Sequence, residues 1–453
     1  MQLNMSIQFR KFVLPLLVCL LIFSTISQAQ NNKARVIVLT DGEIDDQSSM
    51  VRFLLITCDI NLLAIIETNS VYQRSGHSKE DWYEKQLAAY EKVYPNLIKH
   101  NPDYPTAAEI RSKSFVGDED SNHIVKITSH KPKWIEQKPG TGIDYMPDEW
   151  PNTPGSDKIV ELLLDKNPEP VYIQAWGGGN TASKAFYKLK TEHPNDYERA
   201  VSKVVMYNIW YQDDAGNYIE TYHPKVTMLY SDAFNATWAY RIQTNTKDFV
   251  TNHVKNNHGP LGALYPQTYI SEGDSPSYFY SINNGLRSYE NPTYGGWGGR
   301  FIKLPKFQNG YTDARDDGDI NKPLTRWVDQ VNRDFESKLD WCVATKFSDA
   351  NHKPVIKLKT RSDITAKPGK KITLNAKGTK DPDGNNITYK WWQYKDAGSY
   401  DGTVNIANAS AATTSFTVPN DNKQGTIHII LEVSDNGTPQ LVSYKRIIVT
   451  VQP

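Results

Sequence analysis

The stretch from Val36 to Asp46 constrains the fold of this chain more than any other feature. Its first four residues are apolar and favour β-structure, which predicts a short buried strand. Asp41 follows in a turn, and Asp45 and Asp46 fall in the expected first turn of a helix. Ligands of open α/β sheets bind at the carboxyl ends of the strands. We therefore expect these three carboxylates to gather at a ligand-binding edge.

Three like charges at one place repel one another unless a cation lies among them. A divalent cation with oxygen ligands meets this requirement, and Ca²⁺ is the expected choice. The pattern also has a simpler interpretation. Asp45 and Asp46 would then only complement the helix dipole, and Asp41 would only form the turn. The spacing alone does not decide between the two.

Further apolar runs predict a mostly parallel sheet with helices between its strands. Strands are expected at 61–66, 170–175, 200–207 and 226–230, and helices at 78–99, 157–164, 182–190 and 324–339. The strand at 61–66 should present Glu67 and Asn69 at its carboxyl end. The glycine-rich turn Trp176–Thr181 lets the backbone approach a ligand closely. It suits a phosphate, or a backbone carbonyl offered to a metal, although no phosphate-binding motif surrounds it.

Trp297 stands among four glycines in the segment Tyr294–Arg300. Glycine frees the backbone for unusual dihedral angles, so we expect the indole ring to be held at a surface or cleft as a platform for a ligand. The alternative is a structural plug. Glu272, Asp213 and Asp214 lie on expected loops at strand ends and are candidate acids, or else solvated loop residues.

The N-terminus predicts the compartment. Arg10 and Lys11 precede an apolar run at 12–23 that ends in Ser27-Gln28-Ala29, which indicates a secretory signal peptide at residues 1–29, cut near Ala29. The mature chain should be secreted or periplasmic. The run is shorter than the roughly 20 apolar residues of a membrane span, and we expect no later span.

Two cysteines remain after removal of the signal peptide, Cys58 and Cys342, and they either pair or stay as buried free thiols. The formal net charge is +0 with no long basic run, so nothing favours nucleic acid as a partner. The oligomeric state is not predicted.

Composition changes near residue 353. Residues 30–350 are expected to form the α/β domain. From 354 to 453, short alternating strands separated by turn signals predict an all-β sandwich of immunoglobulin type. Its strands are expected at 355–358, 371–374, 387–392, 414–418, 426–433 and 444–451. Trp391 or Trp392 would be its buried core tryptophan.

These features together resemble the nucleoside hydrolases: a strand followed by T-D-x-x-x-D-D and a helix, a glycine-rich turn ending in Asn180-Thr181, and the late Asp274 before a helix. More closely, the chain is similar to a secreted bacterial family that joins a nucleoside-hydrolase-like domain to an immunoglobulin-like domain and includes a cellulose-binding protein. This similarity is carried by the segments Val36–Asp46, Trp176–Thr181, Gln212–Asp214, Gly273–Ser277 and Asn291–Arg300. The resemblance covers nearly all of the mature chain.

The resemblance implies a Ca²⁺ site made by Asp41, Asp46, Asp274 and the backbone carbonyl of Asn180. Asp41 would also orient or deprotonate water. The resemblance further implies that Asp45 and Asp274 bind sugar hydroxyls, with Asn69 near a sugar-binding asparagine. Together with Trp297, these residues form the predicted substrate-binding set.

The sequence departs from the nucleoside hydrolases at the other end of the site. Leu39 replaces the leading aspartate of the first motif, and Gly42-Glu43 replaces Pro-Gly. Gly273 stands where a histidine usually protonates the leaving nucleobase. The metal and sugar end is therefore kept, and the nucleobase end is not.

The prediction from sequence is a secreted hydrolase of N- or O-glycosidic bonds that uses Ca²⁺-bound water, with Asp41 and Asp45 as catalytic residues and a saccharide as substrate. The alternative is a carbohydrate-binding protein for polysaccharides of cellulose type, with a vestigial hydrolase fold. A weaker third interpretation is a secreted nucleosidase. Isolated histidines such as His77 and His123 are interpreted as ordinary polar residues, with His123 the first to test as an acid.

Overall fold

The structure is a computed structural model that describes residues 33–124, 147–239, 245–267, 271–305, 307–421 and 423–452. The predicted signal peptide at residues 1–29 lies outside the described residues. Among the described residues, no helix is long and apolar enough to span a membrane. Cys58 and Cys342 are both buried free thiols, which decides between the two alternatives left by the sequence.

The α/β domain is built on an eight-stranded sheet in which every strand except β7 runs parallel to its neighbours. Its order is β3 (Ser114–Val116), β2 (Asn61–Glu67), β1 (Arg35–Thr40), β4 (Val171–Ala175), β5 (Val204–Ile209), β6 (Thr227–Ser231), β8 (Gly310–Asp313) and β7 (Phe301–Lys303). The chain order reverses between β1 and β4, and this is the position at which open α/β sheets bind ligands.

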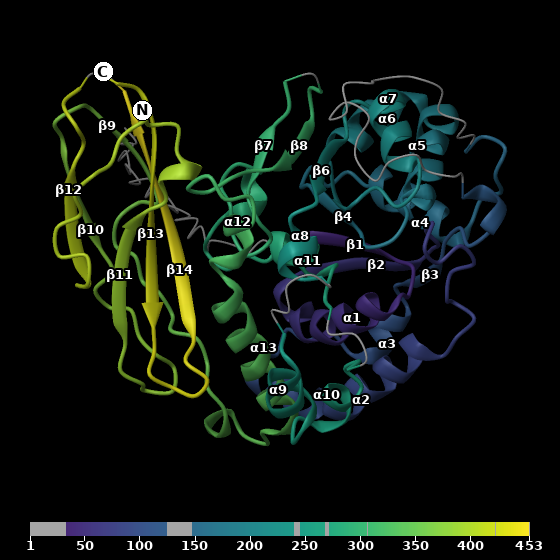
Figure 1. Cartoon of the computed structure of the whole chain (residues 1–453), viewed down its shortest axis with the longest axis horizontal. Coiled ribbons are helices and arrows are strands. Elements are labelled where there is room, and N and C mark those ends of the chain that lie inside the picture. Colours follow the sequence, from purple (N-terminus) through teal and green to yellow (C-terminus); the bar gives the residue numbers. More distant parts are fainter. Residues whose placement is uncertain are drawn as a thin grey trace, which may run out of the picture. The chain divides into compact units, whose positions relative to one another are not determined.

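Helices cover both faces of this sheet (Figure 1). They are α1 (Ile44–Ile56), α2 (Trp82–His100), α3 (Ala107–Arg111), α4 (Pro154–Leu164), α5 (Asn180–Glu192), α6 (Pro194–Ser202), α7 (Ala215–Tyr222), α8 (Phe234–Thr237), α9 (Lys247–Phe249), α10 (Gly259–Ala263), α11 (Ser275–Ser281), α12 (Lys322–Thr325) and α13 (Val328–Val343). Successive side chains of a strand point to opposite faces. Val36 and Val38 of β1 accordingly join the core under α1, α2 and α13, while Ile37 and Leu39 join the core under α4 to α7.

The C-terminal domain is a β-sandwich. One sheet contains β11 (Thr388–Gln393), β13 (Gly425–Ser434), β14 (Val442–Val451) and β9 (Asp363–Ala366), and the other contains β10 (Lys371–Asn375) and β12 (Thr413–Thr417). Trp391 is buried in its core and Trp392 is only partly buried. The predicted fold class is therefore confirmed, an open and mostly parallel α/β sheet followed by an all-β sandwich.

Three segments differ from the prediction. Ala200–Ser202 end α6, which begins at Pro194, so β5 starts only at Val204. Val355 forms an isolated bridge with Lys380 in place of a strand, and β9 takes the edge position of the sandwich. The single helix expected at 324–339 is two helices, α12 and α13.

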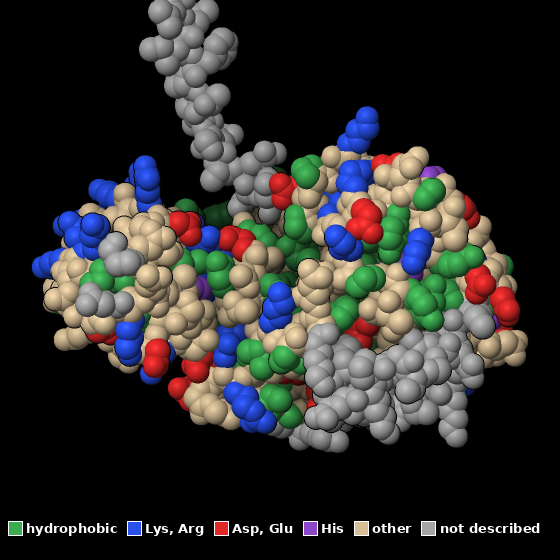
Figure 2. All heavy atoms as spheres, turned by 90° about the horizontal axis from the view of Figure 1, so that it is seen from above, with side chains coloured by type: hydrophobic (Ala, Val, Ile, Leu, Met, Phe, Trp, Pro, Cys, Tyr) green, Lys and Arg blue, Asp and Glu red, His purple; other side chains and the backbone are tan. Residues whose placement is uncertain are grey.

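A buried carboxylate joins the two domains. Asp316 is 0% exposed and accepts a hydrogen bond from the hydroxyl of Tyr394, in the sandwich, at 2.6 Å. It also pairs with Arg300 at 2.7 Å and with Arg326 at 2.8 Å. Its charge is thus balanced by the chain itself. Elsewhere on the surface, Figure 2 shows basic side chains interspersed with acidic ones, in keeping with the formal net charge of +0.

Candidate metal and ligand site

Four aspartates meet at the carboxyl edge of the sheet, next to the point where the strand order reverses. Asp41 directly follows β1, and Asp45 and Asp46 lie in the first turn of α1. Asp274 is the residue before α11, more than 200 residues further along the chain. One carboxylate oxygen from each of Asp45, Asp46 and Asp274 lies within 4.8 Å of the others. The predicted convergence of these distant residues is confirmed.

The cluster is deeply buried. Asp41, Asp46 and Asp274 are at most 2% exposed. Asp46 accepts hydrogen bonds from the hydroxyl of Thr40 and from the backbone N–H of Asp41, and Asp274 accepts one from the hydroxyl of Ser49 at 3.4 Å. Oδ2 of Asp41 and Oδ1 of Asp45 are buried without a hydrogen-bond partner among the described residues. Such atoms are costly unless a ligand satisfies them.

Burial and mutual repulsion raise the pKa values of these carboxyls. Burial and then the charges of Glu43 and Asp41 raise the pKa of Asp45 to about 8. Burial and then Asp41 and Asp274 raise the pKa of Asp46 well above its usual range. Burial, Asp45 and Asp41 have the same effect on the pKa of Asp274. The carboxyls of the cluster thus oppose one another's ionisation, and among the described residues no lysine or arginine forms an ion pair with them.

Two glycines let the backbone approach the cluster. A Cβ at Gly177, just after β4, would lie 2.9 Å from Oδ2 of Asp41, and a Cβ at Gly273 would lie 2.7 Å from Oδ2 of Asp45. Any other residue would therefore push against a carboxylate. Gly273 has a steric role here, which explains why a side chain such as histidine has no room at this position without a shift of Asp45.

This donor set fits a hard divalent cation. The ligand atoms are carboxylate oxygens, the preferred ligands of Ca²⁺. Two of those oxygens have no partner. Among the described residues, no ion pair or hydrogen bond joins the carboxylate groups of the cluster to a lysine, arginine or histidine side chain, and His77 reaches only the backbone oxygen of Asp41. A bound cation would satisfy the orphaned oxygens and offset the repulsion.

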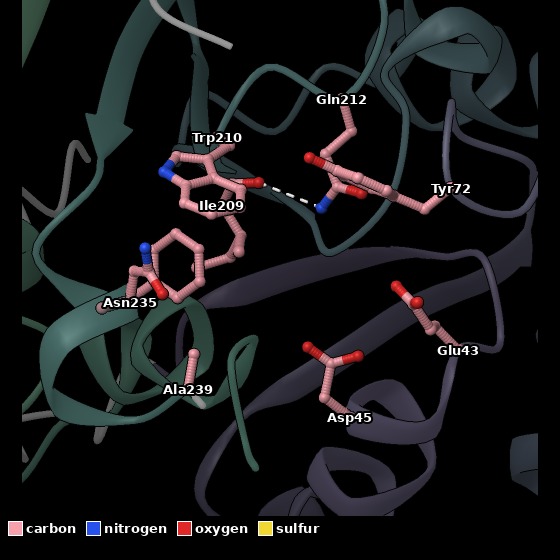
Figure 3. A pocket seen from close by; sticks show the side chains of 9 residues that line it. Glu43, Asp45, Tyr72, Ile209, Trp210, Gln212, Asn235 and Ala239 are labelled. Atoms are coloured by element: carbon pink, nitrogen blue, oxygen red, sulfur yellow. Dashed lines mark hydrogen bonds between the residues drawn. The ribbon is translucent and has the colours of Figure 1, made fainter. Parts of the chain in front are cut away.

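A cavity of about 140 Å³ opens beside the cluster (Figure 3). Its lining combines two carboxylates, two amides, one phenol and an apolar wall. The lining residues are Glu43, Asp45, Tyr72, Ile209, Trp210, Gln212, Phe234, Asn235 and Ala239. Asp45 therefore belongs both to the cluster and to the cavity, so a ligand in the cavity would lie next to the aspartate cluster.

Two predicted site residues, Asn180 and Asn69, form hydrogen bonds within the fold. The carbonyl of Asn180 lies in the first turn of α5 and accepts from the hydroxyl of Ser183 at 2.7 Å. A carbonyl oxygen has a second lone pair beyond this bond, so the metal contact expected of Asn180 stays a prediction. The amide group of Asn69 donates to the carbonyls of Arg74 and Asp120, and its oxygen accepts from Asn180. Asn69 thus fixes loops and is not presented to the cavity.

Trp297 does not stand at a surface or cleft. It is 2% exposed and packs edge-to-face against Phe279 of α11 and Tyr444 of the sandwich. The neighbouring glycines serve close packing, because a Cβ at Gly298 would lie 2.3 Å from the backbone nitrogen of Tyr280. The prediction of a ligand platform at Trp297 is wrong, and the structural plug is the correct interpretation.

The three candidate acids lie outside the cavity lining. Glu272 is 1% exposed and forms a double hydrogen bond with Arg52, at 2.6 and 2.8 Å. Asp213 accepts from the backbone N–H groups of Asn180 and Ala215, and Asp214 is the residue before α7 and 8% exposed. Asp213 thus holds the backbone, and Glu272 ties the segment that presents Asp274 to Arg52 of α1.

Sequence reasoning missed most of the cavity wall. Trp210, Gln212 and Asn235 follow strands β5 and β6, and Glu43 lies between two predicted site residues. The available sequence signal was that these residues follow a strand, but this signal does not show which of their side chains face the cavity. His77 was interpreted as ordinary, yet its Nδ1 lies 2.7 Å from the backbone oxygen of Asp41. His123 pairs with Asp118 at 2.8 Å and does not line the cavity.

Two known families match this chain. The family described as cellulose-binding Sde182, nucleoside hydrolase-like domain, matches residues 35–301. The family described as cellulose-binding protein Sde0182, C-terminal domain, matches residues 371–451. The predicted boundaries at 1–29, 30–350 and 354–453 are not tested by these matches and remain predictions. No curated protein matches the chain.

Among solved structures, a nucleoside hydrolase-related hypothetical protein from Saccharophagus degradans, described as associated with carbohydrate metabolism, is 30% identical. The match covers 93% of this chain and 100% of that chain, with a TM-score of 0.78. A PKD domain is 23% identical over 20% of this chain and 79% of that chain, with a TM-score of 0.15. The type III effector XopQ complexed with adenosine diphosphate ribose is 10% identical over 69% and 94%, with a TM-score of 0.36. The last two scores are too low to carry an argument.

Proposed function

This chain belongs to the cellulose-binding family with a nucleoside hydrolase-like domain, and from that premise we propose that it hydrolyses a glycosyl bond of a saccharide at the aspartate cluster, with Ca²⁺ as cofactor. One observation carries the proposal. Buried carboxylates from distant parts of the chain converge within 4.8 Å, with two oxygens unpartnered, beside a cavity. The predicted secretion of the chain would bring it to such saccharides.

The position of each aspartate in the site determines its proposed role. Asp41, Asp46 and Asp274 would hold Ca²⁺ together with Asp45. When bound, Ca²⁺ supplies positive charge that makes water more acidic and anchors sugar hydroxyls. Oδ2 of Asp41, which has no partner, accepts the proton of the water whose oxygen bonds to the anomeric carbon. Asp45, in the cavity wall, orients the sugar and stabilises the positive charge that develops as the glycosidic bond breaks.

The leaving oxygen also needs a proton. The second carboxyl in the cavity wall is Glu43, which lies beside Asp45 in Figure 3. We assign the transfer of this proton to Glu43, in place of Glu272, Asp213 and Asp214. The place of this carboxyl in the cavity wall supports the assignment.

A second candidate function is carbohydrate binding without turnover. The description of the matching family as cellulose-binding favours it, as does Gly273, which provides no acid where the hydrolases have a histidine. On this interpretation the cluster would bind Ca²⁺ and sugar hydroxyls only. The two functions share a site and differ in whether product is released.

The test uses the mature chain with cello-oligosaccharides, aryl glycosides and nucleosides, in Ca²⁺ and in a chelator. We expect sugar release in Ca²⁺ only, and its loss by a factor of at least about 10³ in Asp41→Asn, because the water loses its proton acceptor. Asp103→Asn, an exposed aspartate paired with Lys33, is the matched control. Saccharide binding without release of sugar would decide for the second candidate, and release of a nucleobase for the third interpretation.

A further inference from the structure

The cavity has a flat aromatic wall that the sequence did not single out. Trp210, at the end of β5, lines it together with Ile209, Phe234 and Ala239. In Figure 3, Trp210 and Asn235 stand on one side of the cavity, and Glu43 and Asp45 stand on the other. The indole ring thus faces the acidic groups across the space that a ligand would take.

The backbone of Trp210 is held in a conformation that tryptophan rarely adopts. Its φ is 58°, in the left-handed region, which costs about 1–2 kcal/mol for a residue other than glycine. The ring is fixed by a hydrogen bond from Nε1 to Asp232 at 2.6 Å and by edge-to-face packing on Phe234 at 5.0 Å. Strain that the surroundings impose on a site residue is a sign of function.

The two sides of the cavity differ in polarity, so a ligand that contacts both needs one apolar face and one polar face. The Trp210 side offers a flat apolar face, and the opposite side offers carboxylates. The amides of Gln212 and Asn235 and the phenol of Tyr72 lie around this space. A sugar ring has this combination, since its C–H face can stack on an aromatic ring while its hydroxyls bond to carboxylates and amides.

The size of the cavity limits how much of a glycan can enter. Its volume of about 140 Å³ is below the roughly 300–1,000 Å³ of pockets that bury a whole drug-sized ligand. One sugar ring fits, and a run of several rings does not. The rest of a longer glycan must therefore remain outside.

The remaining described surface does not offer a platform for a flat polysaccharide sheet. Apart from Tyr72, which lines the cavity, the exposed aromatic residues of the described chain are Tyr222 and Phe347, from two separate parts of the sequence. The described residues of the sandwich contribute no exposed aromatic side chain. The face in Figure 2 likewise shows hydrophobic side chains interrupted by polar ones.

We propose that the cavity binds the terminal sugar of a soluble glycan end-on, with that ring stacked on Trp210 and its hydroxyls directed to Asp45. Trp210 takes the role that the sequence suggested for Trp297. This inference rests on the proposed function only in taking a saccharide as the ligand, and it holds whether or not the bond is cleaved.

The test measures binding of cellobiose, cellotetraose and cellohexaose by calorimetry in the presence of Ca²⁺. We expect nearly equal dissociation constants for the three, because each presents one end to the cavity. Trp210→Leu should weaken binding about tenfold, and Trp210→Phe should retain most of it. Both variants keep an apolar contact with Phe234, and only phenylalanine keeps a flat ring. Tyr222→Ala, a 47% exposed aromatic outside the cavity lining, is the control.

Several results would overturn the inference: wild-type affinity in Trp210→Leu, affinity that grows steadily with chain length, capture by crystalline cellulose without affinity for the soluble chains, or binding of nucleosides alone. If Trp210→Leu does not fold, as judged by circular dichroism and thermal unfolding, the ratio between wild type and Trp210→Phe with the chain-length series still decides. Absence of sugar release with intact Trp210-dependent binding would contradict the proposed hydrolysis and leave this inference standing.

Discussion

Two regions of this protein bury carboxylates in opposite ways. At the junction with the sandwich, Asp316 is bonded to Arg300, Arg326 and the hydroxyl of Tyr394. Beneath α1, Glu272 is likewise paired with Arg52. At the edge of the sheet, Asp45, Asp46 and Asp274 face one another, and none of them pairs with a basic side chain in the described part of the chain. Burying an ionised group is costly unless it is paired.

The difference separates support from function. Where a carboxylate only stabilises the fold, this chain supplies its counter-charge. Where the four aspartates gather, no counter-charge pairs with their carboxylates among the described residues, and we expect a bound cation to supply it. We therefore expect a cation and a ligand to stabilise the aspartate cluster and to leave the junction around Asp316 unchanged.

The largest effect is expected at the junction. Asp316→Ala leaves the buried side chain of Arg300 and the partly buried side chain of Arg326 without this partner, and breaking a buried pair in this way costs about 3–5 kcal/mol. Urea unfolding should show this loss equally with Ca²⁺ and with a chelator. A variant that unfolds like the wild type would show that the junction tolerates an unpaired charge, and the contrast between the two regions would lose its basis.

Addition of Ca²⁺ should act on the aspartate cluster alone. At free Ca²⁺ a hundred times the dissociation constant, binding stabilises the folded chain by about 2.7 kcal/mol, which thermal unfolding would detect as a higher Tm. Asp274→Asn removes a ligand and should abolish this gain.

Asp274→Asn also distinguishes the aspartate cluster from the junction when no metal is present. In a chelator, Asp274→Asn should be at least as stable as the wild type, because it removes one of several repelling carboxylates. Substitution of Asp316 has the opposite sign. A wild-type response to Ca²⁺ in Asp274→Asn would place the metal elsewhere.

A smaller, pH-dependent effect is expected at the junction. Nη1 of Arg446 lies 2.8 Å from Nδ1 of His428, and burial followed by the charge of Arg446 lowers the pKa of His428 from 6.5 to about 3. The unfolded chain therefore binds the proton first. The contribution of neutral His428 is complete above pH 6.5 and is lost as the pH falls toward 3, by about 2 kcal/mol at pH 5.

His223 provides a comparison in the other domain. Burial and then Lys190 lower its pKa to about 3 as well, so His428→Gln should remove only part of the acid sensitivity between pH 7 and pH 5. Urea unfolding at the two pH values measures this. An unchanged slope in His428→Gln would show that His428 is already protonated in the folded protein.

Much of the fold could be predicted because it depends on local patterns. The apolar run Val36–Leu39 and the helix that follows Asp45 were both expected, and the shift of β5 by a few residues arose because α6 continues to Ser202. Asp274 was placed near Asp46 by resemblance, and the structure confirms it. Trp297 was misplaced because glycines permit close packing as well as exposure, and the sequence does not show which applies.

By itself, the sequence determined most of the strands and helices and the position of the aspartates at one edge of a sheet. Both follow from short stretches of sequence, namely the spacing of apolar residues and the position of a residue just after a strand. Only the tertiary structure decided that Glu272 meets Arg52, that Asn69 is occupied by loop carbonyls, and that Trp210 forms the cavity wall. The physical reason is that pairing and burial depend on contacts between residues far apart in the chain, and a short stretch of sequence does not indicate these contacts.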